Sequence, residues 1–189
     1  MLRMLLTLLA AVLSLGATPL PRPAVPKVAP LKGAAAKGAP TRPAATDLDF
    51  DARNPASLIA LLAAAGAKAT VAEREADTVF VAVTSASVDF SMQFADCNPQ
   101  GRDCKAVLFD NITDKAGPSF AQLNAFNQSS LTCRGYEDKT GKPHVVYSTL
   151  LFEGDNRARI ATQVAAWRGC VGEFRDFLKD PTAYLASAP

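Results

Sequence analysis

The spacing of apolar residues divides the chain into helical and extended segments. Leucine and isoleucine residues recur at helical spacing between Asn54-Pro55, which supplies an N-cap and a first-turn proline, and Gly66, which favours a helix end. A second helix is expected from about Pro118 to Gln128, with three inward residues, Phe120, Leu123 and Phe126. These patterns predict two short amphipathic helices.

The third predicted helix has the clearest pattern and runs from about Asn156 to Lys179. Asp155 or Asn156 caps its start, and Pro181 stops any continuation. Its apolar residues are spaced alternately by four and three positions, which places them on one face. They are Ile160, Val164, Trp167, Val171, Phe174 and Leu178. The sequence therefore predicts a long helix that covers one face of a sheet.

Between the helices the apolar period shortens to two, as expected for strands. Six strands are predicted, with approximate bounds at 70–76, 78–84, 88–94, 105–112, 132–137 and 144–151. The order of elements is α-β-β-β-β-α-β-β-α. Because helices and strands do not alternate regularly, this order predicts an α+β fold, with an antiparallel sheet of about six strands and three helices.

Two N-terminal segments differ from the rest of the chain, and the first is an export signal. Residues 1–3 give a short basic start, residues 4–15 form an uncharged apolar run, and small residues up to Ala17 suit a signal peptidase. The apolar run is too short to span a bilayer core, which needs about 20 apolar residues. We therefore expect residues 1–17 to be a cleaved signal peptide.

The second segment, residues 18–46, is rich in proline and alanine and contains five basic and no acidic residues. It has too few packing side chains to offset the entropy of ordering, so we expect a disordered linker. Its charges are widely spaced, which predicts only weak contact with an anionic envelope surface. Without both segments the chain has 14 Lys and Arg against 18 Asp and Glu, and this net charge of −4 argues against a nucleic-acid partner for the predicted domain 47–189.

Four cysteines in an exported chain of this size predict disulfides. Cys97 and Cys104 bracket a turn-forming segment between two predicted strands, which favours a local disulfide between them. Cys133 and Cys170 then remain to form the second disulfide, although three connectivities are formally possible. Closing the short loop stabilises the fold by roughly 2.5 kcal/mol on the chain-entropy account. The chain has no C-x-x-C motif, and its single histidine lies far from any cysteine pair, so no metal site is predicted.

Five short motifs follow one another along the predicted domain in a characteristic order and spacing. The first two are Pro55-x-x-Leu58-Ile59-x-x-Leu62-x-x-x-Gly66 and Phe90-Ser91-Met92-Gln93-Phe94-x-Asp96-Cys97. The others are Leu123-Asn124-Ala125-Phe126-Asn127, Tyr136-x-Asp138-x-x-Gly141-x-Pro143 and Trp167-x-x-x-Val171-Gly172-Glu173-Phe174. Together these motifs resemble the YbjN domain. The resemblance covers about residues 54–178 and implies a fold like that of type III secretion chaperones and a role as a bacterial sensory transduction regulator. Leu131-Thr132-Cys133 departs from the basic or aromatic stretch common in the family.

The sequence is poor in the groups that catalysis needs. His144 is the only imidazole, and its place after Pro143 at the start of a predicted strand favours a structural role. Asp96, Asp103 and Asp110 lie near the predicted disulfide hairpin, but the spacing of a calcium loop is absent. We therefore predict no catalytic residue, no cofactor and no metal, and a periplasmic or secreted module for protein interaction or regulation.

Two alternatives stay open at this point. One is an enzyme or enzyme inhibitor built around carboxylates near Asp96 and Asp110. The other is a protein that binds a small ligand in an apolar pocket between the sheet and the last helix. The sequence does not name the protein partner, and a homodimer is one option.

The export prediction is testable on protein recovered from the native envelope. We expect a mature N-terminus near residue 18 and, under non-reducing conditions, a peptide in which Cys97 is linked to Cys104. Mass mapping measures both features in one sample. An intact Met1 on cytoplasmic protein with free thiols would contradict the prediction.

Overall fold

The computed structural model describes residues 49–114 and 117–187, so the predicted signal peptide and linker lie outside the described residues. The described elements are, in chain order, α1 (Pro55–Ala64), β1 (Lys68–Arg74), β2 (Val79–Thr84), β3 (Phe90–Ala95), β4 (Ala106–Ile112), α2 (Phe120–Ser129), β5 (Arg134–Glu137), β6 (Pro143–Leu150), α3 (Arg157–Lys179) and α4 (Pro181–Ser187). This is the predicted α+β order with one additional short helix. No described helix is both long and apolar enough to cross a membrane.

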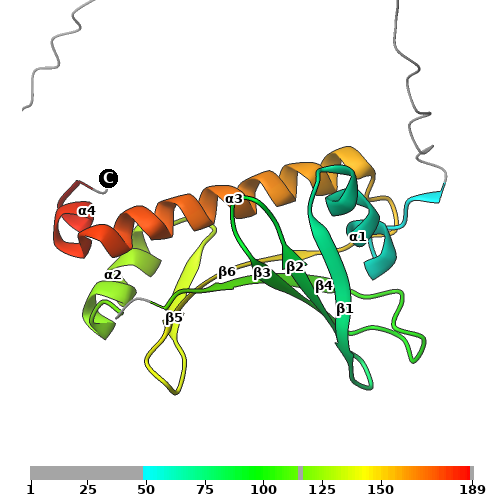
Figure 1. Ribbon diagram of the computed structural model, residues 1–189, viewed down its shortest axis with the longest axis horizontal. Helices are drawn as coiled ribbons and strands as arrows, with labels where there is room; N and C mark the ends of the chain where they lie inside the picture. The colour runs from blue at the N-terminus through cyan, green and yellow to red at the C-terminus, as the bar shows by residue number, and fades with distance from the viewer. Residues whose placement is uncertain (1–48, 115–116, 188–189) are drawn as a thin grey trace, which may run out of the picture. The chain divides into compact units, whose positions relative to one another are not determined.

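The six strands form one antiparallel sheet in the order β1-β2-β3-β4-β6-β5. The first four strands are neighbours in both sequence and space. β6 then lies between β4 and β5, so α2 leads to an edge strand and the chain returns into the sheet through β6 (Figure 1). The antiparallel sheet confirms the predicted fold class.

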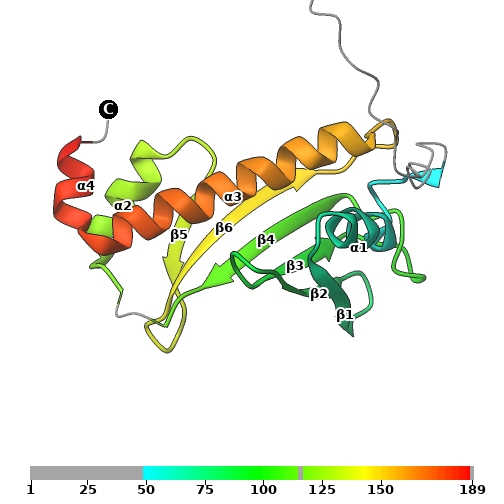
Figure 2. The same ribbon diagram turned by 45° about the horizontal axis from the view of Figure 1, so that its top comes forward.

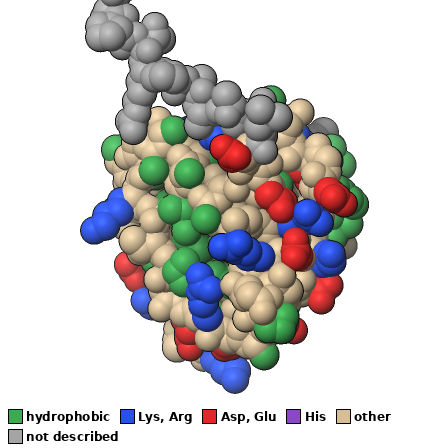
Figure 3. Space-filling view, turned by 90° about the vertical axis from the view of Figure 1, so that its right-hand side faces the viewer, with side chains coloured by type: hydrophobic (Ala, Val, Ile, Leu, Met, Phe, Trp, Pro, Cys, Tyr) green, Lys and Arg blue, Asp and Glu red, His purple; other side chains and the backbone are tan. Residues whose placement is uncertain are grey.

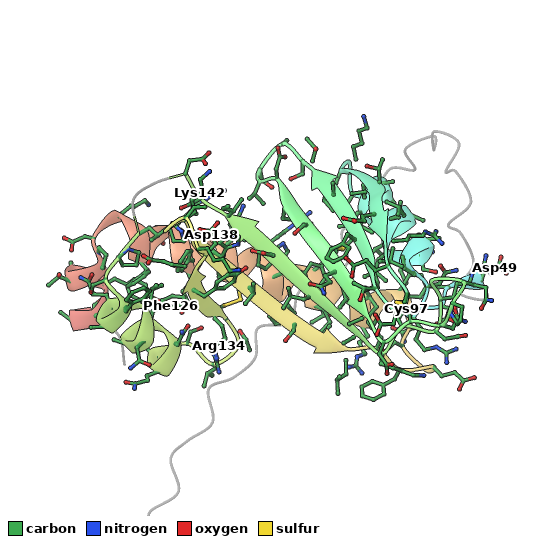
Figure 4. All side chains as sticks on the ribbon, turned by 90° about the horizontal axis from the view of Figure 1, so that it is seen from below. Asp49, Cys97, Phe126, Arg134, Asp138 and Lys142 are labelled. Atoms are coloured by element: carbon green, nitrogen blue, oxygen red, sulfur yellow. A yellow bond between two sulfur atoms is a disulfide. The ribbon has the colours of Figure 1, made fainter. Side chains whose placement is uncertain are left out.

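The helices lie on one face of the sheet (Figures 1 and 2). α3 crosses this face, with α1 near β1 at one end and with α2 and α4 near β5 at the other. The strands alternate accordingly, and the side chains buried beneath the helices include Val81, Met92, Phe109 and Tyr147. Within the described residues no helix covers the opposite face, which faces the viewer in Figure 4.

One apolar stripe of α3 forms the centre of the core. The predicted members Ile160, Val164, Trp167, Val171 and Phe174 are all buried. The rings of Phe90 and Phe109 lie 5.6 and 5.9 Å from the Trp167 ring. The last predicted member, Leu178, packs against the core but is only half-buried, whereas Phe177, which was not predicted, is fully buried because the end of α3 turns it toward α2 and α4.

The start of α2 differs from the prediction. Gln122 N donates to Ser119 Oγ at 3.3 Å and Ser119 N donates to Gln122 Oε1 at 3.0 Å, which makes a capping box before the helix. Phe120, expected to point inward, is 76% exposed. It occupies the first helical position, and the buried face of α2 is formed by Leu123 and Phe126 instead.

The short helix α4 was not predicted. Pro181 does end α3, but proline also suits the first turn of a new helix, and Asp180 Oδ1 accepts from Ala183 N at 3.0 Å. The Tyr184 ring lies 5.6 Å from the Phe177 ring and 6.1 Å from the Phe126 ring. α4 therefore closes the end of the core that α2 and β5 leave open.

The edge strand β5 is fastened to α2 by the side chain of Asn127. Its Nδ2 donates to Gly135 O at 3.0 Å, and Gly135 N donates to its Oδ1 at 2.7 Å, so the amide takes the place of a neighbouring strand. Gly135 is required here because a Cβ atom would lie 2.9 Å from Phe174 and 3.0 Å from Leu123. Asn127 thus satisfies the outward-facing backbone of Gly135 on the β5 edge of the sheet.

Replacing Asn127 tests this role in stability. In Asn127→Ala the buried N–H and C=O of Gly135 lose their partners, which we expect to lower the free energy of unfolding by about 1–3 kcal/mol. Asn124→Ala, on the exposed side of the same helix, is the matched control and should change little. Urea denaturation of the oxidised protein measures both, and equal stabilities would argue against the role.

Candidate functional site

The structure joins the cysteines in the pairs that the sequence favours, Cys97 with Cys104 and Cys133 with Cys170. The first disulfide closes the hairpin between β3 and β4. The second ties the segment after α2 to the middle of α3 across 37 positions, and a loop of that length contributes about 4 kcal/mol on the chain-entropy account. Two disulfides are consistent with an oxidising compartment.

Asn98 organises the loop of the first disulfide. Its Oδ1 accepts from Gln100 N and Arg102 N at 3.0 and 2.9 Å, and its Nδ2 donates to Asp103 at 2.7 Å. Asp103 also lies 3.8 Å from Arg53, just before α1. Asp103 therefore fastens the hairpin loop to the start of the first helix.

The three carboxylates expected near this hairpin do not form one cluster. Asp96 is exposed and follows β3 in the left-handed conformation, with a φ of 54°. Asp110 pairs with Ser91 at the opposite end of the β3–β4 ladder. The register therefore keeps Asp96 and Asp110 apart, and in the described ranges no group of three or more His, Cys, Asp or Glu residues could hold a metal ion.

Asp110 instead meets His144 on the uncovered face of the sheet. His144 Nδ1 lies 2.8 and 3.1 Å from the two Asp110 oxygens, and its Nε2 lies 3.6 Å from Asp138 Oδ2. The Tyr136 ring stacks on the imidazole at 4.6 Å, and its hydroxyl donates to Asp110 at 3.2 Å. We call these four residues the His144 cluster.

The environment of the His144 cluster changes two pKa values. The pKa of Tyr136 is raised to about 12, mainly by burial and then by the charge and hydrogen bond of Asp110. The phenol therefore stays protonated at neutral pH and donates a hydrogen bond to Asp110. Hydrogen bonds from Lys142 N and the Thr140 hydroxyl lower the pKa of Asp138 to about 2. Figure 4 shows Asp138 and Lys142 at the end of the sheet opposite Cys97.

The His144 cluster has an imidazole–carboxylate pair, but its contacts are internal. Among the described residues no serine, threonine or cysteine side chain is hydrogen-bonded to His144, which contacts Asp110, Asp138 and Tyr136. The His144 side chain is 12% exposed, and its contacts join β4 to the β5–β6 turn. This arrangement fits the structural role predicted for His144 better than proton transfer to a substrate.

An apolar groove of about 320 Å³ lies between α1 and α3. It is lined by Leu61, Leu62, Ala64, Ala65, Ala161, Val164, Ala165 and Arg168. The four alanines are exposed, so the groove opens to solvent. Figure 3 views the side that carries α1 and shows hydrophobic side chains at the surface with basic side chains beside them. The small-ligand alternative placed a pocket elsewhere, between the sheet and the last helix.

Comparison with known proteins gives the family. The model of the YbjN family, described as "Putative bacterial sensory transduction regulator", matches residues 54–180. The chain belongs to the YbjN family. The match starts at the N-cap of α1 and ends just after α3, so it includes the whole sheet. No curated protein and no solved structure matches, and the likeness to type III secretion chaperones therefore stays a prediction.

The motifs that carry the YbjN resemblance lie at structural positions. Asn127 bonds to Gly135 on β5, Gly141 adopts a φ of 79° in the β5–β6 turn, and Trp167 and Phe174 are buried in the core. These residues explain the shared fold but not a shared ligand. The family description names a regulator and no enzymatic activity.

Sequence reasoning missed both the groove and the His144 cluster. The signal for the groove is the solvent side of α3, where alanines replace the charged residues that an exposed helix face normally carries. The cluster has no comparable signal because Asp110 and His144 are 34 positions apart and meet through strand pairing.

The tyrosines provide a test of the electrostatics. Burial raises the pKa of all three, to about 12 for Tyr136 and Tyr184 and in the same direction for Tyr147. Unfolded tyrosines ionise near pH 10, so this stabilisation is complete below about pH 10 and is lost as the pH rises toward about 12. Tyrosinate absorbance and denaturation at increasing pH measure the effect.

Replacing a single carboxylate isolates the contribution of Tyr136 to the tyrosine titration. Asp110→Asn removes the adjacent negative charge, so we expect one of the three tyrosines to ionise at lower pH than in the wild type. Asp114→Asn, an exposed carboxylate paired with Lys142, is the control and should leave the tyrosines unchanged. An identical titration for Asp110→Asn and wild type would show that the cluster geometry is wrong.

Proposed function

We propose that this YbjN protein is an exported, non-catalytic module that regulates by binding a protein partner in the bacterial envelope. The observation that carries the proposal is the α1–α3 groove, an apolar surface open to solvent on two packed helices. The regulator description of the family supports the role, and the predicted signal peptide and the two disulfides support the compartment.

The groove has the properties of a preformed binding surface. Leu58 and Leu62 anchor α1 in the core with at most 2% exposure, and Trp167 and the disulfide at Cys170 anchor α3. Walls that are already ordered lose little conformational entropy on binding. Among the described residues no carboxylate, imidazole or thiol lines the groove, which supports binding rather than proton transfer.

Small-ligand binding is a second candidate because the groove volume lies at the low end of ligand sites, about 300–1,000 Å³. Such sites enclose most of the ligand surface, whereas this groove is open along its alanines. The open geometry favours a larger partner that shields its own outer side. The carboxylate-site alternative loses support because Asp96 and Asp110 lie at opposite ends of the β3–β4 ladder.

Affinity purification of the mature chain from native envelope tests the proposal. We expect the wild type, a variant lacking residues 18–46 and Ala166→Trp to enrich the same protein. Ala165→Trp fills the groove and should reduce that enrichment about tenfold or more. Ala166 is exposed on the same helix but does not line the groove, so it controls for bulk alone.

Two results would contradict the proposal. The first is no protein above background with the wild-type bait, and the second is equal enrichment by Ala165→Trp and Ala166→Trp. Unfolding midpoints of both tryptophan variants establish that each is folded before the comparison is made.

A further inference from the structure

We infer that the α1–α3 groove binds an amphipathic helix of the partner and that this helix places an acidic side chain against Arg168. The inference rests on the proposed function and adds the chemistry of the bound segment. It follows from the charge of the groove walls, from the hydrogen bonding of their backbones and from the size of their side chains.

The groove walls carry one charge. α1 contains no charged residue, and α3 has only Arg168 between Arg159 and Glu173. Arg168 is exposed, lines the groove and forms no ion pair or hydrogen bond with any described residue. Its positive charge therefore lies uncompensated beside apolar walls, and a complementary ligand combines apolar side chains with one acidic group.

The backbone of the walls offers no hydrogen-bonding partner to an extended peptide. The N–H and C=O groups of α1 and α3 are bonded within the helices, and the carbonyls of Leu61, Leu62 and Ala63 also accept from the end of α1. These walls therefore present no free backbone groups with which a strand could form a β-ladder. A helix satisfies its own backbone hydrogen bonds and needs none from the walls, so it suits this groove better than a strand does.

The small side chains at the groove allow close approach of a third helix. Ala161, Ala165 and Arg168 are four and three residues apart, so they form one row along α3. A groove of about 320 Å³ accommodates a few large apolar side chains at the i, i+3 and i+7 positions of a bound helix. Arg168 lies at one end of this row, where it meets the polar border of such a helix.

An acyl chain with a carboxylate head has similar chemistry but fits the groove less well. Because Ala64, Ala65, Ala161 and Ala165 are exposed, a bound acyl chain would keep one apolar side in water. An amphipathic helix buries its apolar stripe and keeps a polar face outward. The geometry therefore favours the helix.

Two synthetic amphipathic helices of roughly 18 residues, about five turns, test the inference. They are identical except for one Glu or one Lys at the border of the apolar face, and fluorescence anisotropy measures their binding to the mature, oxidised chain at low salt. We expect the wild type to bind the Glu peptide about tenfold more tightly than the Lys peptide. Arg168→Glu should reverse this preference.

Matched variants distinguish an effect of the groove from an effect of the net charge of the protein. Lys139→Glu makes the same charge change in the exposed β5–β6 turn and should keep the wild-type preference. Ala165→Trp should weaken both peptides, and Ala166→Trp neither. Equal affinity of the wild type for both peptides, an unchanged preference in Arg168→Glu, or binding of neither peptide overturns the inference. The inference is also overturned if decanoate binds in a way that depends on Arg168 and Ala165 while neither peptide binds.

The envelope purification distinguishes failure of this inference from failure of the proposed function. If Ala165→Trp loses the envelope partner while the peptides show no charge preference, the groove binds the partner and only the acidic-helix inference fails. If Ala165→Trp retains the partner as fully as Ala166→Trp does, the proposed use of the groove fails as well.

Discussion

The packing of one apolar stripe of α3 on one face of the sheet is the interaction on which the rest of the structure depends. A six-stranded sheet is roughly 24 Å wide at about 4.8 Å per strand, whereas a helix covers only about 10 Å. α3 therefore buries the centre, where Trp167 packs on Phe90 and Phe109. Each large side chain buried in this way contributes about 1.5–3 kcal/mol, and α1, α2 and α4 have to cover the ends.

Because several helices together cover the sheet, a junction forms wherever two of them meet. At the β5 end the junction is closed, because Phe126, Phe174, Phe177 and Tyr184 interlock their rings and the Cys133–Cys170 disulfide joins the segment after α2 to α3. At the β1 end α1 and α3 meet through small side chains, and the space between them opens to solvent. The same packing that stabilises the domain therefore produces its apolar groove.

The two faces of the sheet contribute differently to the structure. The helix-covered face supplies the core, and the uncovered face holds polar contacts such as the His144 cluster, which fixes the β5–β6 turn to β4. Together with the Asn127 bonds to Gly135, these contacts secure the short edge strand β5, which pairs with only one neighbouring strand. The domain is thus braced at its β5 end, while the apolar groove lies at the other end.

Patterns along the amino-acid sequence were sufficient to predict the features that depend on neighbouring residues. The Asn54 cap, the end of α1 just before Gly66, the α3 stripe up to Phe174 and the alternating strands follow from contacts within a turn or a hairpin. Four other features became visible only when the chain was folded: the insertion of β6 beside β4, the full burial of Phe177 in place of Leu178, the exposure of Phe120, and the groove. Each of these depends on elements that are distant in sequence, and a local pattern carries no information on which of them come into contact.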